Sequence, residues 1–251
     1  MTRLDQLLVQ RNLANSRTHA KKLVDAGRVQ LSSGGDWQVA RKPGQSVGGE
    51  TALRVEPLPE DRYVSRAGLK LAAILDHTGL DPRGWQALDV GCSTGGFSDC
   101  LLQRGAAQVV GVEVGRNQLA PRLRDDPRMQ LFEGVNARYL QKAQLSPYGD
   151  AGFDAVVMDV SFISQTLILP QLPPLMKSGG QLLSLVKPQF EVGPEHIGKG
   201  GLVRDESLYN KVREKITGLC LELGFEVRDT IDSPIRGGDG NREFLLWAVR
   251  A

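Results

Sequence analysis

The chain has 251 residues, of which 41% are hydrophobic and 24% charged, with a formal net charge of +2. This composition predicts an ordinary globular protein with one large or two modest domains, and the charge neither requires nor excludes a nucleic-acid partner. No apolar run is long enough to cross a bilayer and no charged-then-apolar leader opens the chain, so we expect no membrane-spanning segment. Three scattered cysteines, Cys92, Cys100 and Cys220, favour a reducing cytoplasm over a disulfide framework or a metal site.

Residues 1–56 are predicted to form a small α+β domain. Apolar residues at helical spacing predict one helix over 3–9 and another over 17–26, with Ser16 as its N-cap and Gly27 as its C-cap. Short strands are expected at 29–31, 38–39 and 53–55. Basic residues lie along and beside the second helix, where they suit phosphate contacts on a folded RNA; the alternative is a solvated charged face. The predicted RNA contacts are Arg3, Arg11, Arg17, Lys21, Lys22, Arg28 and, in the next domain, Arg66.

The order of residues in this first domain resembles the alpha-L RNA-binding module of a small-subunit ribosomal protein, pseudouridine synthases and tyrosyl-tRNA synthetases. The usual Asn-Gly turn after the first strand is replaced here by Ser32-Ser33-Gly34-Gly35-Asp36. The resemblance implies an RNA-binding role for the domain. The matching residues are Arg3-Leu4-Asp5, Leu13-Ala14-Asn15-Ser16-Arg17, Ala20, Gly27-Arg28-Val29, Lys42-Pro43-Gly44 and Val47.

Residues 57–62, which include Pro57 and Pro59, are predicted to be a stiff linker to a second domain over 63–251. This domain opens with a helix that carries Lys70 and runs to about Asp76. From residue 87 strand patterns alternate with helical patterns, which predicts a mostly parallel α/β sheet covered on both faces. The last two strands, 226–232 and 243–249, are expected to form an antiparallel hairpin. The other predicted elements are strands at 87–90, 109–113, 129–133, 155–159 and 181–186 and helices at 96–103, 118–123, 164–172 and 208–223.

A glycine-rich turn connects the first predicted strand of this sheet to the next helix. The spacing of Gly91, Gly95 and Gly96 differs from the G-x-G-x-x-G of dinucleotide enzymes and looks like the first motif of S-adenosylmethionine methyltransferases, whose Rossmann-like sheet has this topology. The following strand ends at Glu113, where a carboxylate would bind ribose hydroxyls. The alternatives are a structural turn and a solvated strand-end charge. The predicted cofactor contacts are Asp89, Gly91, Cys92, Ser93, Gly95, Gly96, Phe97, Glu113 and Asn136.

Four charged residues are predicted to meet at the carboxyl edge of the sheet. Asp159 and Lys187 each end an apolar strand, Glu243 opens the final strand, and Lys70 lies on the helix before the sheet. The alternative is a set of structural ion pairs. A ribose hydroxyl holds its proton tightly at neutral pH, and a lysine that is partly desolvated beside a second cation can act as a base. The carboxylates would orient the lysines and balance their charge.

Several motifs in the second domain resemble those of the TlyA family, often labelled hemolysin A, whose members are similar to FtsJ-type ribose methyltransferases. With the first domain, the resemblance covers nearly the whole chain. Two departures are Ala67, where the family usually has Gly, and Glu113, where Asp is usual. The motifs are Ser65-Arg66-Ala67-Gly68-Leu69-Lys70-Leu71, Leu88 to Phe97, Asp159-Val160-Ser161-Phe162-Ile163-Ser164, Val186-Lys187-Pro188-Gln189-Phe190-Glu191 and Gly240-Asn241-Arg242-Glu243-Phe244.

The resemblance implies 2′-O-methylation of ribosomal RNA, typically on cytidine, with S-adenosylmethionine as the methyl donor and no metal. It puts the family's catalytic tetrad on Lys70, Asp159, Lys187 and Glu243. We expect an in-line displacement with Lys187 as the base and Lys70 assisting, in a cytoplasmic enzyme whose partner is ribosomal RNA or a ribosomal subunit.

Other functions are weighed against this one. They are an RNA-binding assembly factor with an inactive methyltransferase fold, a membrane-active hemolysin and a dinucleotide-dependent reductase. The hemolysin would need a leader, a spanning segment or a lytic amphipathic helix, and the glycine spacing disfavours the reductase. The segment 191–205, rich in glycine and charge, is either a mobile loop over the RNA site or a surface connection.

Overall fold

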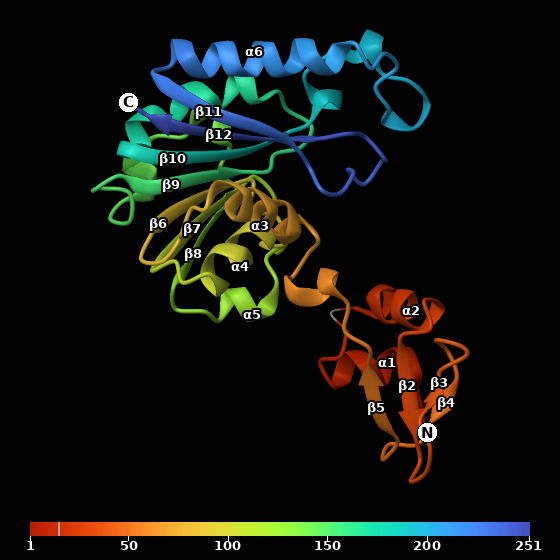
Figure 1. The fold of residues 1–251 in the computed structure, drawn as a ribbon. Helices are drawn as coiled ribbons and strands as arrows, with labels where there is room; N and C mark the ends of the chain where they lie inside the picture. The colour runs from red at the N-terminus through yellow and green to blue at the C-terminus, as the bar shows by residue number, and fades with distance from the viewer. Residues whose placement is uncertain (15) are drawn as a thin grey trace. The chain divides into compact units, whose positions relative to one another are not determined.

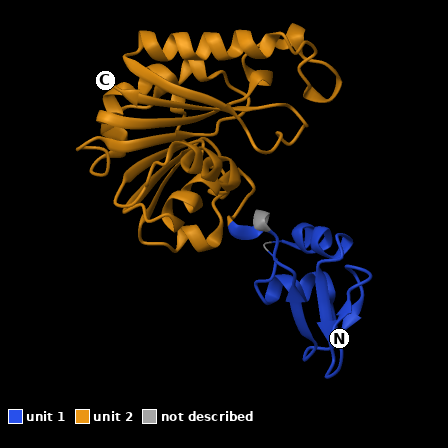
Figure 2. Cartoon of the chain, in the orientation of Figure 1, with its two compact units in different colours: residues 1–62 blue, residues 63–251 orange. Residues whose placement is uncertain are grey.

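The computed structural model describes residues 1–14 and 16–251; Asn15, which belongs to the alpha-L motif, lies outside the described residues. The chain divides into two compact units, Met1–Arg62 and Tyr63–Ala251 (Figure 2). Each unit has a hydrophobic core of its own and is described by itself.

Unit 1 packs two helices on a three-stranded antiparallel sheet of order β3-β2-β5. The side chain of Ser16 accepts a hydrogen bond from the backbone N–H of His19 at 3.1 Å, and Gly27 adopts a φ of 71°, so both predicted helix caps form. The sequence patterns missed the two-residue strands β1 and β4, which pair with each other. The elements are β1 (Thr2–Arg3), α1 (Leu4–Gln10), α2 (Arg17–Asp25), β2 (Val29–Ser32), β3 (Gln38–Val39), β4 (Ser46–Val47) and β5 (Ala52–Val55).

Residues 57–62, which we expected to be a linker, fall in unit 1. Their last four residues form the 3-10 turn η1 (Pro59–Arg62). The guanidinium of Arg28 donates hydrogen bonds to the carbonyl oxygen of Glu56 at 3.0 and 2.7 Å and forms an ion pair with Asp61. Part of this segment is therefore bonded to the body of unit 1.

Unit 2 is built on a seven-stranded sheet of order β11-β12-β10-β9-β6-β7-β8 (Figure 1). Within the described sheet β12 runs antiparallel to both neighbours and the remaining pairs are parallel. The predicted Rossmann-like sheet with an antiparallel last strand is confirmed. The strands are β6 (Gln86–Val90), β7 (Gln108–Glu113), β8 (Met129–Glu133), β9 (Phe153–Met158), β10 (Met176–Val186), β11 (Phe225–Asp232) and β12 (Phe244–Arg250).

Helices cover both faces of this sheet because successive strand residues point to opposite sides. Ala87, Ala155 and Leu183 pack with residues of α3 (Ala67–Thr78) and α4 (Gly96–Gln103). Their strand neighbours, such as Leu88 and Leu182, belong to a second core that includes residues of α6 (Leu208–Glu222). Between β7 and β8 lies the short helix α5 (Pro121–Arg124).

The helix expected over 164–172 does not form. Two 3-10 turns take its place, η4 (Gln165–Leu167) and η5 (Leu169–Gln171), and a third, η6 (Pro173–Leu175), follows. Pro170 lies inside the predicted span, and proline both lacks the N–H that an α-helix needs and clashes with the preceding turn. Short 3-10 turns tolerate this arrangement.

Gly68 lies where α3 leaves no room for a side chain. A Cβ at this position would lie 2.4 Å from Cγ of Tyr63. That ring is buried in the core shared by α3 and α4, so the chain cannot relieve the clash by a small rotation of the side chain.

We therefore expect Gly68→Ala to destabilise unit 2 by about 1–3 kcal/mol, the usual range for overpacking. The matched control is Gly218→Ala inside α6, where nothing lies within 4 Å of the new methyl group. This control is expected to stabilise the chain by about 0.5–1 kcal/mol, because alanine is the better helix former. Urea denaturation measures both, and a Gly68→Ala variant that is as stable as wild type or more stable would contradict the close packing of Gly68.

Candidate active site

Side chains alternate between the two faces of the sheet along each strand, and this alternation places five charged side chains on one face near one edge. In four of the strands that carry them the residue two positions away along the chain packs in the core beneath α3 and α4, and that residue is Ala87, Val157, Leu185 or Leu245. In β7 the core residue on this face is Val109, four positions before Glu113. The residues that share this face are Asp89, Glu113, Asp159, Lys187 and Glu243. The cross-strand pairs Val90–Met158 and Val186–Phe244 show that these strand ends lie at a common edge.

The four predicted catalytic residues form two lysine–carboxylate pairs at this edge. Lys70, on α3, pairs with Glu243, and both side chains are almost completely buried. Nζ of Lys187 lies 2.6 Å from Oδ1 of Asp159 and donates a hydrogen bond to Oγ of Ser161 at 2.8 Å. Lys187 and Glu243 directly follow and precede the cross-strand pair Val186–Phe244, so the two ion pairs are neighbours.

The turn after β6 folds tightly against this edge. Gly91, Ser93 and Gly95 have φ values of 77°, 48° and 92°. A Cβ at Gly91 would lie 2.9 Å from Val160, which follows Asp159, and left-handed φ values are readily adopted only by glycine. The glycines are therefore required for the turn to lie beside the Asp159 strand end.

Asp89 is buried beneath this turn with one oxygen unpaired. Its Oδ2 accepts hydrogen bonds from the backbone N–H and the hydroxyl of Ser98, at 2.9 and 2.6 Å. Its Oδ1 accepts none from the described residues. Burial raises the pKa of Asp89 to about 7, against the Ser98 hydrogen bonds and with the help of the negative charges of Asp159 and Glu113. A buried carboxylate with a free oxygen suits a ligand that brings a positive charge and an N–H donor.

Glu113 ends β7 and holds the glycine turn in place. Its two carboxylate oxygens accept the backbone N–H groups of Ser93 at 2.9 Å and Gly115 at 2.8 Å. A carboxylate has about four lone-pair sites, so acceptor capacity remains for a ligand hydroxyl.

Three of the predicted cofactor residues, Cys92, Phe97 and Asn136, have side chains that are buried or hydrogen-bonded within the chain. The side chains of Cys92 and Phe97 are buried in unit 2, and burial raises the pKa of the Cys92 thiol well above its usual value. Both residues could reach a ligand only through their backbone. Asn136 is exposed, and its Oδ1 caps the 3-10 turn η2 (Ala137–Tyr139) by accepting the N–H of Arg138 at 3.0 Å.

The predicted RNA contacts of unit 1 divide into two groups. Lys21 and Lys22 are exposed on α2, and Lys21 pairs with Asp25 at 3.1 Å. Arg3 and Arg17 are about half exposed and both bind Asp5, at 3.1 and 3.0 Å. The Arg3 hydrogen bond is the main reason that the pKa of Asp5 falls to about 2.

Arg11 and Arg28 are bound to the backbone instead. Arg11 donates to the carbonyl oxygens of Thr51, at 2.6 Å, and Gly49. Arg28, whose side chain is only 12% exposed, donates hydrogen bonds to the carbonyl oxygen of Glu56 and forms an ion pair with Asp61 near the end of unit 1. Carbonyl groups in turns need donors, and these guanidinium groups supply them. Arg28 is therefore engaged within unit 1, and its contact with RNA stays a prediction, whereas Arg66 is exposed just before α3 in unit 2.

We call the carboxyl edge of the sheet, where the predicted catalytic residues lie, the active edge. One aromatic side chain at this edge received no role from the sequence. Phe162 is 91% exposed, has a φ of 63°, and its ring centroid lies 5.2 Å from that of Phe190. It stands between Ser161, which binds Lys187, and Ser164. Exposure and an uncommon backbone conformation for a bulky residue mark Phe162 as a candidate ligand contact, and neither can be read from the sequence.

Glu191 is a buried residue that binds the segment beside this edge. Its carboxylate, 1% exposed, accepts hydrogen bonds from the N–H of Gln165 at 2.7 Å and the hydroxyl of Ser164 at 2.6 Å. Lys215 on α6 balances its charge at 3.2 Å. The segment that carries Ser161 and Phe162 is thus bonded to the segment that follows Lys187.

The 191–205 segment is bonded to the residues that lead into β12. Ile197 and Val203 form an isolated antiparallel bridge. The buried amide of Asn241 accepts the N–H of Val203 at 3.1 Å and donates to the carbonyl oxygen of Gly201 at 2.8 Å. Because Asn241 lies two residues before Glu243, this segment is coupled to the active edge.

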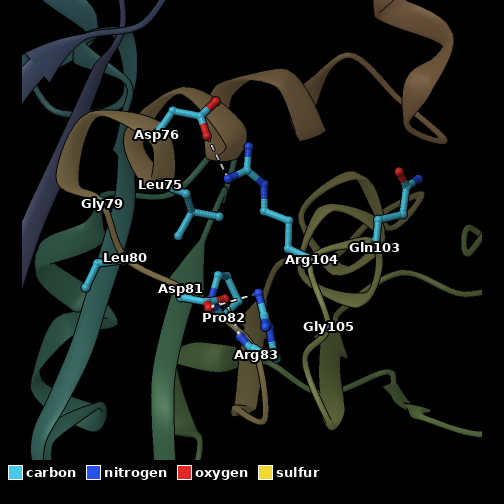
Figure 3. Close-up of a pocket in the computed structure, with 10 residues that line it drawn as sticks. All are labelled: Leu75, Asp76, Gly79, Leu80, Asp81, Pro82, Arg83, Gln103, Arg104 and Gly105. Atoms are coloured by element: carbon cyan, nitrogen blue, oxygen red, sulfur yellow. Dashed lines mark hydrogen bonds and ion pairs between the residues drawn. The ribbon is translucent and has the colours of Figure 1, made fainter.

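A separate hollow in unit 2 lies at the other edge of the sheet (Figure 3). Its lining comes from the ends of α3 and α4 and from the loops that lead into β6 and β7, with Arg104 and Asp76 paired at 2.7 Å. Since the predicted site residues lie at the carboxyl edge, this hollow is not part of the candidate active site.

Within residues 1–14 and 16–251, no group of three or more His, Cys, Asp or Glu side chains could hold a metal ion. In the same part of the chain no helix is both long enough and apolar enough to cross a membrane.

Comparison with known proteins matches both units. Residues 63–250 match the family described as FtsJ-like methyltransferase, and residues 2–52 match the S4 domain. A Mycobacterium tuberculosis protein named 16S/23S rRNA (cytidine-2'-O)-methyltransferase TlyA is 41% identical over 246 residues, which cover 98% of this chain and 88% of that protein. A Brachyspira hyodysenteriae protein named Hemolysin A is 36% identical over 248 residues, or 98% of this chain and 99% of that protein.

Solved structures agree with these matches. A relative from Streptococcus thermophilus is 41% identical with a TM-score of 0.74, covering 99% of this chain and 88% of that one. Fibrillarin from Aeropyrum pernix, solved with natively bound S-adenosyl-L-methionine, shares the fold at 18% identity with a TM-score of 0.50, covering 72% of this chain and 76% of that one.

Replacing Asp89 with Asn is expected to change how stability depends on pH. The folded-state pKa of about 7 lies above the ordinary 3.8, so wild type loses stability as the pH rises from about 4 to about 7. Asp89→Asn keeps an oxygen for the Ser98 donors and has no charge to bury. Its free energy of unfolding should therefore exceed that of wild type at pH 8 but not at pH 4.

Urea denaturation at the two pH values tests this expectation. The control is Asp81→Asn, which removes a carboxylate from a side chain that is 60% exposed and should leave the pH dependence unchanged. If Asp89→Asn follows the same pH dependence as wild type, Asp89 does not carry the buried charge described above.

Proposed function

Because the chain belongs to the FtsJ-like methyltransferase family and is a TlyA-type member with an S4 domain at its amino end, we propose that it methylates ribosomal RNA. The methyl group passes from S-adenosylmethionine to the 2′-hydroxyl of a cytidine. The observation that carries this proposal is the pair of lysine–carboxylate contacts beside the glycine turn, Lys70–Glu243 and Lys187–Asp159.

The residues around the glycine turn fit S-adenosylmethionine. The unpaired Oδ1 of Asp89 suits the ammonium group of its amino-acid portion, and the remaining lone pairs of Glu113 suit its ribose hydroxyls. The left-handed backbone at Gly91 and Gly95 lets the chain approach such a ligand closely. When bound, this cofactor supplies a methyl group activated by a sulfonium centre.

The lysines and carboxylates handle the proton of the 2′-hydroxyl. Lys187, as the amine, accepts this proton on Nζ and becomes an ammonium paired with Asp159. Ser161 holds Nζ from a second direction. The buried Lys70–Glu243 pair supplies a fixed cation and a fixed acceptor beside it, which orient the hydroxyl oxygen.

The remaining basic and aromatic residues suit an RNA substrate. Lys21 and Lys22 on α2 offer charge to phosphates, and sequence-independent phosphate contacts of this kind give affinity that falls with salt. Phe162, beside the Lys187 pair, offers an exposed ring on which an unpaired base can stack.

Transfer of tritium from methyl-labelled S-adenosylmethionine to ribosomal subunits tests the function, together with mapping of the 2′-O-methyl positions. Incorporation at a cytidine 2′-oxygen supports the proposal. RNA binding without methyl transfer would instead support an assembly factor with an inactive methyltransferase fold.

Lys187→Ala is expected to abolish methyl transfer while S-adenosylmethionine binding, measured by calorimetry, stays within about threefold of wild type. A lost general base typically reduces the rate by about 10²–10⁴-fold. The matched control is Lys177→Ala, because Lys177 forms a 2.6 Å pair with Asp154 that also joins β9 and β10 but lies at the other end of these strands. Turnover of Lys187→Ala near the wild-type rate would remove Lys187 from the role of base.

A further inference from the structure

The outer face of the unit 1 sheet carries an aromatic side chain that no part of the proposed mechanism uses. Val29, Leu31 and Val55 point into the core, so the alternate residues point outward. The register pairs Gln30 with Val39 on one side and with Arg54 on the other. Trp37, two residues before Val39, is 40% exposed, and Val39 is 52% exposed. We call Gln30, Trp37, Val39 and Arg54 the outer sheet face.

Arg54 is held rigidly over the ring of Trp37. Its Cζ lies 4.4 Å from the ring centroid. Its Nε and Nη2 donate hydrogen bonds to the side-chain oxygen of Gln30, at 2.8 and 2.6 Å. Gln30 thus fixes the plane of the guanidinium, and the sheet presents an ordered aromatic–guanidinium pair to solvent.

The turn that leads to Trp37 is the one that departs from the alpha-L pattern. Ser32 closes it by donating a hydrogen bond from its hydroxyl to the carbonyl oxygen of Gly35 at 2.7 Å. Gly34 has a φ of 92°, and nothing lies within 4 Å of a Cβ placed on it. The longer turn therefore ends by setting Trp37 on the outer sheet face.

The outer sheet face carries planar groups that suit a planar ligand. Gln30 lies at its centre, and the guanidinium of Arg54 extends from the neighbouring strand β5 over Trp37. The exposed cations Arg41 and Arg54 are matched by Asp36 and Glu56, so the face recognises a ligand through its ring and its guanidinium plane rather than through net charge. Aromatic rings and arginine planes on a small sheet are the surfaces on which unpaired bases of RNA stack. An apolar protein contact would require neither the cation nor its fixed plane.

We propose that the outer sheet face binds an unpaired base of an RNA strand, which stacks on Trp37 and Arg54. The inference rests on the proposed function in that RNA is the substrate. It adds a second point of contact in unit 1, separate from the basic residues of α2.

The test is the affinity of the full-length chain for a fluorescein-labelled, unstructured RNA of ten nucleotides, measured by anisotropy. Stacking contributes about 1–3 kcal/mol per base, so Trp37→Ala is expected to raise Kd about tenfold. Trp37→Phe keeps an aromatic plane and is expected to stay within about threefold of wild type. Trp37→Leu keeps apolar area without a π face and is expected to bind as weakly as Trp37→Ala. Arg54→Gln is expected to raise Kd and reduce its salt dependence.

Controls separate this inference from its alternatives. Leu221→Ala removes an apolar side chain that is 58% exposed on α6, and is expected to leave Kd unchanged. Wild-type affinity in Trp37→Ala would overturn the proposal. Wild-type affinity in Trp37→Leu would also overturn it, because apolar area without a π face would then be sufficient. Methyl transfer by wild type is measured separately. If wild type transfers the methyl group and the Trp37 variants bind RNA with unchanged Kd, only this inference is rejected. If wild type transfers no methyl group but substitution of Trp37 weakens RNA binding, only the proposed function is rejected.

Discussion

The ion pair between Lys70 and Glu243 is the interaction on which the geometry of the active edge depends. The two residues are 173 positions apart, and their contact joins α3 to the start of β12. Removing two charges from water costs several kcal/mol per ion, so a buried pair of this kind fixes position more reliably than it stabilises the fold. Because α3 precedes the sheet and β12 is its last strand along the chain, this pair fixes the start of β12 against α3.

Charge balance at this edge explains why a cationic ligand fits there. Four carboxylates, Asp89, Glu113, Asp159 and Glu243, share the face with only two lysines. Burial raises the pKa of Asp89, and the negative charges of Asp159 and Glu113 add to this shift. A ligand that carries a sulfonium and an ammonium group would supply the missing positive charge. The excess of carboxylates over lysines on this face would therefore favour the binding of such a ligand.

Unit 1 shows that basic residues of similar sequence context can have opposite roles. Lys21 and Lys22 are exposed on α2, whereas Arg11 and Arg28 bind carbonyl oxygens of the same unit. Arg54 has a third kind of contact, because its guanidinium is hydrogen-bonded to Gln30 and lies over the ring of Trp37. The difference lies in which backbone oxygens and rings the fold brings within reach.

The sequence by itself determined the strand–helix alternation, the glycine turn and the identity of the four charged residues, because periodicity and turn chemistry are local properties. It overestimated the helix over 164–172, where Pro170 favoured 3-10 turns. Only the tertiary structure decided which partner each charged group has, as in the ion pair of Arg28 with Asp61 and the unpaired oxygen of Asp89. It also decided which side chains are exposed, such as the ring of Phe162. Those contacts join residues distant along the chain, and distance in space is set by packing rather than by neighbouring residues.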